Sequence, residues 1–156
     1  MTDSKIPEGF FADGPSPYSN HIGPFYYKRL LDEDGEVKKG WVGILLNEVH
    51  IGGNNRGHGG LLLTILDEAM GMNAAFHRNR TPVVTVSMQT NFMGPTIPGQ
   101  FLMATAEVTH ATKTMAFVEG KAWCDNEIVG SASGVWKYLS KAPQMPQLKT
   151  VETASK

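Results

Sequence analysis

The longest apolar stretch of the chain covers residues 61–76 and follows a turn rich in glycine and asparagine. Leucine, methionine and alanine, which favour helices, fill most of this stretch, so the pattern predicts a buried α-helix over about residues 59–78. A helix that is apolar on nearly every side must be covered on nearly every side. We therefore expect the rest of the chain, together with a partner subunit, to enclose it.

Beyond this helix the pattern changes to alternating apolar and polar residues, which is typical of β-strands with one apolar face. The clearest case is residues 83–92, where Val84, Val86 and Met88 alternate with polar residues. Strands are predicted at about 37–49, 83–92, 101–109, 115–124 and 128–139, and residues 22–31 are interpreted as a short helix or an extended lid. Short connections join the later strands, so we predict an α+β fold in which an antiparallel five-stranded sheet wraps around the long central helix.

Length and composition predict how the chain is organised. Its 156 residues suffice for one domain with a substantial core, and we assign this domain to residues 21–140. Residues 1–20 are rich in Gly, Pro, Ser and Asp and are expected to be flexible. The tail, residues 141–156, contains few apolar residues and is expected to be disordered.

Charge and cysteine content limit the partners and the location. The formal net charge of −1 at pH 7 gives no indication of a nucleic-acid partner. The apolar stretch is too short and too interrupted for a membrane span. The single cysteine, Cys124, excludes an internal disulfide framework and fits a reducing environment, so we expect a cytoplasmic protein.

An acidic residue, Asp67, lies about two turns into the predicted helix. Small residues share its side of the helix, within about 60° when successive residues are about 100° apart: Gly60, Thr64, Gly71 and Ala74. This leaves space in front of the carboxylate for a substrate, a strand or a symmetry-related chain. The alternative is a buried acid paired with a neighbouring hydroxyl or amide, as buried Asp usually is. Glu68 points away and is interpreted as a solvent or interface charge.

The turn before the helix places His58 beside three glycines, Gly57, Gly59 and Gly60. The first N–H groups of a helix have no partner within the helix, and the helix dipole favours negative charge there. Gly59 and Gly60 could therefore donate to a ligand carbonyl, as in an oxyanion hole. The alternative is that the glycines serve a tight turn and that His58 caps the helix.

Other motifs point to no different chemistry. Residues 130–134 lack a serine at the centre of a nucleophile elbow, and neither a P-loop nor His-Glu-x-x-His is present. The five histidines lack metal-ligand spacing, so no metal site is expected. Arg78 and Arg80 match the cations that favour a helix C-terminus, with a phosphate site as the alternative. Lys113 lies on a predicted hairpin tip and is interpreted as solvated.

Three stretches together resemble the hotdog-fold acyl-CoA thioesterases of the PaaI-like type. They are His58-Gly59-Gly60 with its apolar helix and Asp67, residues 83–95, and residues 109–117, and the likeness covers about residues 20–139. The resemblance implies a sheet wrapped around a central helix and a homodimer, often paired into a homotetramer, with active sites at the subunit interface. It implies an acyl-CoA substrate and no cofactor, since CoA is part of the substrate.

The resemblance also implies roles for single residues. Asp67 would be the general base or nucleophile, and the Gly59 N–H would polarise the thioester carbonyl. His58 would orient the turn, and Thr85 matches a position that helps place water in some members. Basic residues would meet the CoA phosphates, with Lys113, Arg78 and Arg80 as candidates.

The chain departs from the family pattern Asn-x-x-Gly-x-x-His-Gly-Gly, because Gly52 stands at the Asn position and Asn55 at the Gly position. Asn54 or Asn55 could supply the amide and hold the turn, since Asn tolerates positive φ. Alternatively the amide is absent. Beside an acyl-CoA thioesterase, this departure motivates one alternative, a non-catalytic acyl-CoA-binding protein. A hotdog enoyl-CoA hydratase or dehydratase is a second alternative that ranks lower, because such enzymes typically pair an acid with a His in a different arrangement.

Overall fold

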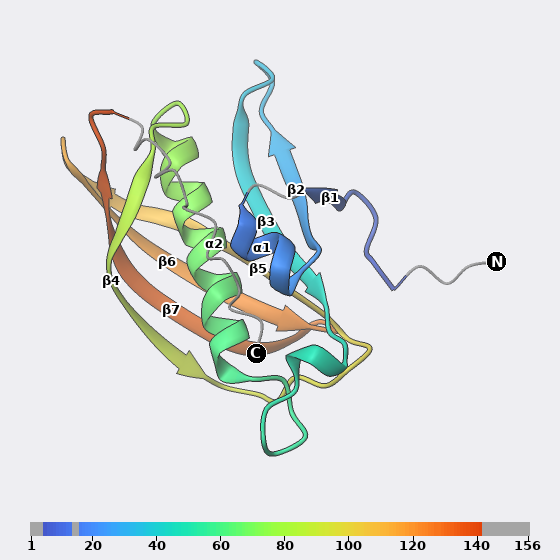
Figure 1. The fold of residues 1–156 in the computed structure, drawn as a ribbon. Helices are drawn as coiled ribbons and strands as arrows, with labels where there is room; N and C mark the ends of the chain where they lie inside the picture. Colours follow the sequence, from blue (N-terminus) through green and yellow to red (C-terminus); the bar gives the residue numbers. More distant parts are fainter. Residues whose placement is uncertain (1–4, 14–15, 142–156) are drawn as a thin grey trace, which may run out of the picture.

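One sheet of seven antiparallel strands and one long helix make up most of the fold, which a computed structural model describes for residues 5–13 and 16–141 (Figure 1). The elements are β1 (Phe11–Asp13), α1 (Pro17–Ile22), β2 (Phe25–Leu31), β3 (Val37–Leu45), the 3-10 helix η1 (Glu48–His50), α2 (Gly59–His77), β4 (Val83–Phe92), β5 (Phe101–Ala111), β6 (Met115–Cys124) and β7 (Glu127–Tyr138). The strand order is β1-β2-β3-β5-β6-β7-β4. The α+β class and the sheet around a central helix are confirmed, whereas the number of five strands was wrong.

The two additional strands precede the first predicted one. β2 occupies most of the segment that we interpreted as a short helix or lid, and it pairs with β1 on one side and β3 on the other. Phe25 and Tyr27 are buried and the residue between them less so, which is the alternation of a strand. A continuous aromatic run concealed this alternation. β3 is also shorter than predicted, because η1 follows it.

The segment expected to be flexible, residues 1–20, contains β1 and most of α1. The sheet therefore begins before residue 21, the predicted start of the domain. Residues 1–4 and 14–15 and the part of the expected tail from residue 142 onward lie outside the described residues. No helix in the described part of the chain is long and apolar enough to cross a membrane.

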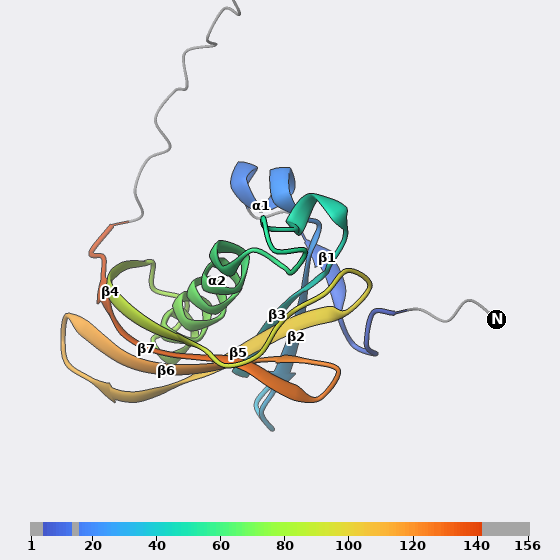
Figure 2. The same cartoon turned by 90° about the horizontal axis from the view of Figure 1, so that it is seen from below.

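α2 lies in the concave face of the curved sheet, as the view in Figure 2 shows. Its side chains at helical spacing form the centre of the core, including Leu62, Ile65, Leu66, Ala69 and Met70. Contact with β6 is close, because a Cβ at Gly120 would lie 2.8 Å from Met70 Cγ. A larger residue at position 120 would therefore push the helix away from the sheet.

A buried amide fixes α2 against β3. The Asn73 side chain accepts a hydrogen bond from the Gly40 N–H (2.9 Å) and donates one to the Gly40 carbonyl (3.0 Å). It also donates to the Ala69 carbonyl at 2.8 Å. Buried polar groups are costly unless paired, so this clamp specifies the position of the helix along the sheet.

β4 forms one edge of the sheet, and several of its apolar side chains are exposed, although Val83 and Met88 pack partly against the core. Val86 is 54% exposed and Phe92 59% exposed. A register shift between Thr85 and Ser87 interrupts the pairing of β4 with β7, and no other strand of the described residues lies beyond β4. The predicted strand is confirmed, but its apolar residues do not share one environment: Val84 and Val86 are exposed, whereas Met88, beyond the register shift, packs partly against the core.

Candidate active site

The start of α2 is held by its own cap. The Gly60 N–H donates to His58 Nδ1 at 2.9 Å, so His58 is the N-cap, as the capping interpretation predicted. The Gly59 N–H, in contrast, meets no acceptor in the described part of the chain. Gly59 therefore keeps a free donor at the positive end of the helix dipole, whereas the Gly60 donor is already used.

The loop before the cap is a tight turn. The Gly52 N–H donates to the Arg56 carbonyl at 2.7 Å, and the Asn55 N–H donates to the Gly52 carbonyl at 3.2 Å. Asn55 has a φ of 58°, so it adopts the left-handed conformation that glycine would take at this family position. The expectation that Asn55 could hold the turn is confirmed. The Asn54 side chain accepts from the Arg56 N–H within the same turn.

A second histidine, which nothing in the sequence pattern singled out, supports this region. His50 is buried, and its Nδ1 accepts from the Asn47 N–H at 3.0 Å. Its Nε2 lies 2.7 Å from the Ile22 carbonyl and therefore donates to it, while its own carbonyl accepts from the His58 N–H at 2.8 Å. His50 thus links the end of α1, η1 and the cap of α2.

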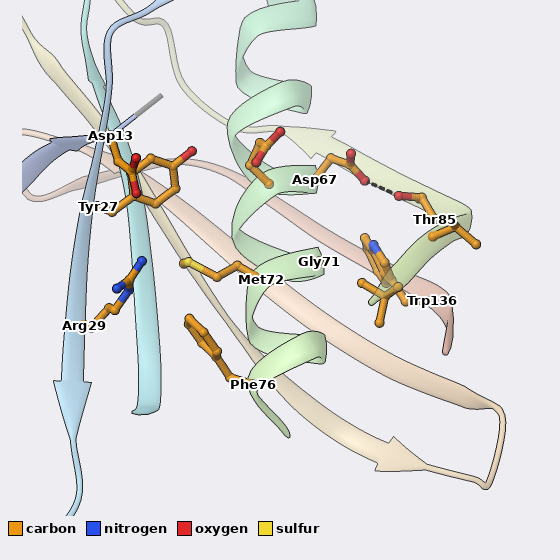
Figure 3. A pocket seen from close by; sticks show the side chains of 12 residues that line it. Asp13, Tyr27, Arg29, Asp67, Gly71, Met72, Phe76, Thr85 and Trp136 are labelled. Atoms are coloured by element: carbon orange, nitrogen blue, oxygen red, sulfur yellow. Dashed lines mark hydrogen bonds between the residues drawn. The ribbon is translucent and has the colours of Figure 1, made fainter. Parts of the chain in front are cut away.

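Asp67 lies on α2 at the wall of a cavity of about 520 Å³ (Figure 3). It is half-buried, and the Thr85 hydroxyl donates to its Oδ1 at 2.7 Å. The structure thus brings together two predicted site residues from α2 and β4. The cavity is lined by Asp13, Tyr27, Arg29, Asp67, Glu68, Gly71, Met72, Phe76, Val83, Val84, Thr85 and Trp136.

Glu68 lines the same cavity as Asp67, although we interpreted it as a solvent or interface charge. It is half-buried, and burial, followed by the neighbouring Asp67 carboxylate, raises the pKa of Glu68. Tyr27 lies across from the helix on β2, and its hydroxyl is enclosed without a hydrogen-bond partner in the described chain. Burial, with Glu68 and Asp13 as further causes, raises the pKa of Tyr27.

The predicted phosphate-binding cations lie at the other end of α2. The Arg78 guanidinium donates to the carbonyls of Thr112 and Lys113 and lies over the Tyr138 ring at 3.9 Å. It therefore clamps the β5–β6 hairpin to the helix end. Arg80 and Lys113 are exposed near this clamp, and none of the three cations lines the cavity of Asp67.

Asp67 and Gly59 are not adjacent in one chain. They are eight residues apart on α2, which at the rise of an α-helix is about 12 Å. A single carbonyl group cannot contact both within one subunit.

The described side chains give little support for metal-dependent or cysteine-based chemistry. In the described part of the chain, no group of three or more His, Cys, Asp or Glu residues could hold a metal ion. Burial, with Asp125 as a smaller cause, raises the pKa of the Cys124 thiol to about 12, so it is a poor nucleophile at neutral pH.

Comparison with known proteins identifies the family. The family model described as the thioesterase superfamily matches residues 54–131, which include the capped turn, α2 and Asp67. The chain belongs to the thioesterase superfamily. A Pseudomonas aeruginosa protein of the name "Putative esterase PA0474" is 32% identical over 136 residues, covering 85% of this chain and 96% of that protein.

Solved structures place this thioesterase-superfamily chain in the hotdog fold. The PaaI protein from the phenylacetic acid degradation operon of E. coli superposes with a TM-score of 0.65 at 18% identity, covering 80% of this chain and 86% of that one. The protein BH2602 from Bacillus halodurans, crystallised with CoA, gives a TM-score of 0.59 at 28% identity, covering 64% and 66%. The predicted likeness to PaaI-like thioesterases is confirmed.

Proposed function

We propose that this chain hydrolyses acyl-CoA thioesters to the free acid and CoA. The observation that carries the proposal is the Asp67 carboxylate, which lies at the wall of a large cavity with one oxygen held by the Thr85 hydroxyl. Membership of the thioesterase superfamily supports the reaction class. The CoA in the Bacillus halodurans structure supports CoA as the carrier of the acyl group.

Asp67 is the proposed general base or nucleophile. Thr85 occupies Oδ1, so Oδ2 is the atom that faces the reactants. As a base, Asp67 takes a proton from water while the water oxygen bonds to the carbonyl carbon; the C–S bond then breaks and the sulfur leaves with a proton as the CoA thiol. As a nucleophile, Asp67 displaces the thiolate to form an anhydride, which water cleaves. Both routes yield the acid and CoA.

The Gly59 N–H is the proposed donor to the carbonyl oxygen, which gains negative charge as the carbonyl carbon is attacked. Asp67 and Gly59 are about 12 Å apart along α2, so they can act on one carbonyl only if they come from different subunits. We therefore place the site at the interface of a homodimer, and the uncovered edge of β4 is the proposed contact. Pairing of dimers into a homotetramer is the further step that the resemblance implies.

The remaining site residues receive supporting roles. His58 fixes the turn that presents Gly59. Asn54 and Asn55 are exposed in the preceding loop and are proposed to contact substrate near the helix start. Arg80 and Lys113 are the proposed partners of the CoA phosphates. Arg78 already hydrogen-bonds to the hairpin, and we propose that it supports this surface.

A second candidate function is acyl-CoA binding without hydrolysis. One observation favours it: Gly52 has no side chain at the position where the family carries an asparagine amide.

Release of free thiol from a chain-length panel of acyl-CoAs tests the proposal. Asp67→Asn should lower kcat/KM by at least about a hundred-fold, because it removes the proposed base or nucleophile. Thr85→Val should lower it less, because the carboxylate remains but loses its hydrogen bond. Turnover retained in a folded Asp67→Asn variant would contradict the proposal. Binding of acyl-CoA by wild type without thiol release would favour the binding role, and hydration of an enoyl-CoA would favour the hydratase.

A further inference from the structure

Trp136, on β7, borders the cavity of Asp67 with an indole N–H that meets no acceptor in the described part of the chain. The side chain is only 1% exposed. In the described residues, the fully enclosed side-chain atoms without a hydrogen-bond partner are the hydroxyl oxygens of Tyr27, Thr90 and Tyr138. The indole nitrogen of Trp136 is not one of these enclosed atoms. It therefore remains open to the cavity. A donor in such a place is normally satisfied by water or by a ligand.

Two independent contacts place this N–H near Asp67. Trp136 is the cross-strand partner of Thr85, so the two side chains are neighbours on one face of the sheet, and Thr85 donates to Asp67. On the helix, a Cβ at Gly71 would lie 3.2 Å from Trp136 Nε1, and Gly71 follows Asp67 by one turn. Figure 3 shows the indole nitrogen facing α2 beside Gly71.

We propose that Trp136 is a substrate-binding residue whose N–H donates a hydrogen bond to an oxygen acceptor on the acyl group, about one helical turn beyond the scissile carbonyl. The indole N–H can only donate, so a plain alkyl chain would cover it and leave it unpaired, which costs free energy. The preferred substrates are therefore acyl thioesters with a carbonyl oxygen in the chain. This inference rests on the proposed function for the position of the thioester.

The small size of Gly71 and the apolar side chains around it fit this role. Val83 and Val84 line the cavity from β4, next to Thr85, and Met72 and Phe76 line it from α2. These residues suit the carbon atoms of an acyl chain. Trp136 is the residue of β7 that lines the cavity, and its donor lies among them on the side of the cavity formed by β4.

Paired acyl-CoAs test the preference. Each acyl-CoA of the panel carries one ketone, and the position of the ketone moves by one carbon from one member to the next. Each member is compared with the unsubstituted chain of equal length; levulinoyl-CoA and valeryl-CoA are one such pair. In wild type, the ratio of kcat/KM for the best ketone over its alkyl partner should exceed one. Trp136→Phe should lower this ratio by about five- to thirty-fold, the effect of losing one hydrogen bond to a buried group. Trp123→Phe is the matched control, because Trp123 lies on β6 outside this cavity.

Gly71→Ala provides a second variant that keeps the tryptophan. Its methyl group would lie 3.2 Å from Nε1, so it should obstruct the N–H and lower the same ratio. If Trp136→Phe fails to fold, Gly71→Ala tests by itself whether the Trp136 N–H causes the ketone preference. A ketone preference that is absent from wild type, or unchanged in the folded variants, overturns the proposal.

Binding to Asp67→Asn separates this inference from the proposed function, because it requires no turnover. The chain has three tryptophans, which give three indole N–H signals in a two-dimensional NMR spectrum. The signal that is missing from the spectrum of Trp136→Phe belongs to Trp136. That signal should shift more with levulinoyl-CoA than with valeryl-CoA, while the Trp123 signal stays in place. A selective shift without any hydrolysis by wild type would refute only the proposed function. Equal shifts with both ligands would refute the role of Trp136.

Discussion

At the scale of single residues, the candidate site depends on which hydrogen-bonding groups of Asp67 and Gly59 have no partner in the described chain. Thr85 takes one carboxylate oxygen, and His58 takes the Gly60 N–H. What remains is one carboxylate oxygen and one helix-start donor, the two groups that thioester cleavage requires. The departure from the family pattern lies in the preceding turn, where Asn55 adopts the conformation expected of glycine.

The second departure from the family pattern, Gly52 at the Asn position, can be reversed by restoring the asparagine. A Cβ at Gly52 would lie 3.5 Å from His58 Cα and Cδ2, an ordinary contact, and the backbone there is not left-handed. Gly52→Asn therefore fits without strain and places an amide beside the cap. We expect kcat/KM for acyl-CoA to rise about ten-fold, the effect of one good hydrogen bond. Gly53→Asn is the matched control, because a Cβ at Gly53 meets nothing within 4 Å. Equal activity of wild type and a folded Gly52→Asn variant would contradict this expectation.

Glu68 predicts a pH dependence of stability. Burial and Asp67 raise the pKa of Glu68 above its ordinary value of 4.5, so the folded state binds the proton more tightly than the unfolded chain. The free energy of unfolding should therefore fall as pH rises from 4.5 through the raised pKa. Glu68→Gln removes this effect, so its Tm should exceed that of wild type at neutral pH and approach it near pH 4.5.

Glu107→Gln is the matched control for this measurement. The Lys39 hydrogen bond lowers the pKa of Glu107, so this carboxylate adds stability above pH 4.5 that is lost on acidification. Glu107 is largely exposed, so the effect should be small, and Glu107→Gln should lower the Tm slightly at neutral pH. A Glu68→Gln variant that is less stable than wild type at neutral pH would contradict the assignment.

At the scale of elements, the Asn73 clamp is the contact that sets α2 on the sheet. Asn73→Ala leaves the buried Gly40 N–H without its partner, and an unsatisfied buried donor costs about 1–3 kcal/mol. We expect denaturant unfolding to show a loss of this size. Asn91→Ala, on the exposed strand β4, should change stability by about 0.5 kcal/mol or less. Similar losses in both variants would contradict the clamp.

Local patterns predicted the elements whose period is regular. α2 was predicted within one residue of its observed bounds, and β4 to β7 within about two, because long periodic segments carry a strong signal. β2 was missed, because the aromatic residues at its start follow one another without visible alternation. β1 has three residues, too few for any period to appear.

Residue spacing predicted only the site residues on or beside one element, α2, whereas Thr85, on β4, was predicted from the family resemblance. Asp67, His58 and Gly59 all lie on or beside α2, so all three could be identified from one predicted helix before the fold was known. Glu68 was not assigned to the cavity of Asp67, because its angle on the helix does not tell where β2 lies. Trp136 is far from Asp67 in the sequence, and only the pairing of β4 with β7 joins them.

At the scale of the whole molecule, the single chain is incomplete for the proposed chemistry. Val84, Val86 and Phe92 of β4 are exposed at the sheet edge, and an uncovered edge strand readily pairs with another chain. The eight-residue separation of Gly59 and Asp67 supports the same proposed arrangement, a homodimer with shared sites. The homotetramer and the cytoplasmic location stay predictions.

The measurement that tests the shared site most directly is complementation between two inactive variants. Asp67→Asn removes the carboxylate. Gly59→Pro removes the N–H at the first helical position, where proline is well tolerated and the preceding His58 is already extended. A Cβ at Gly59 would lie 3.1 Å from the ring of Phe92, which is exposed and can move.

Each variant alone should release almost no thiol from acyl-CoA. After unfolding and refolding of an equal mixture, half of the dimers pair the two variants, and one of their two sites then combines the intact Asp67 with the intact Gly59. The account predicts recovery of about a quarter of the wild-type activity, since half of the dimers regain half of their sites. Mixed dimers that are detected by native mass spectrometry but remain inactive would contradict it.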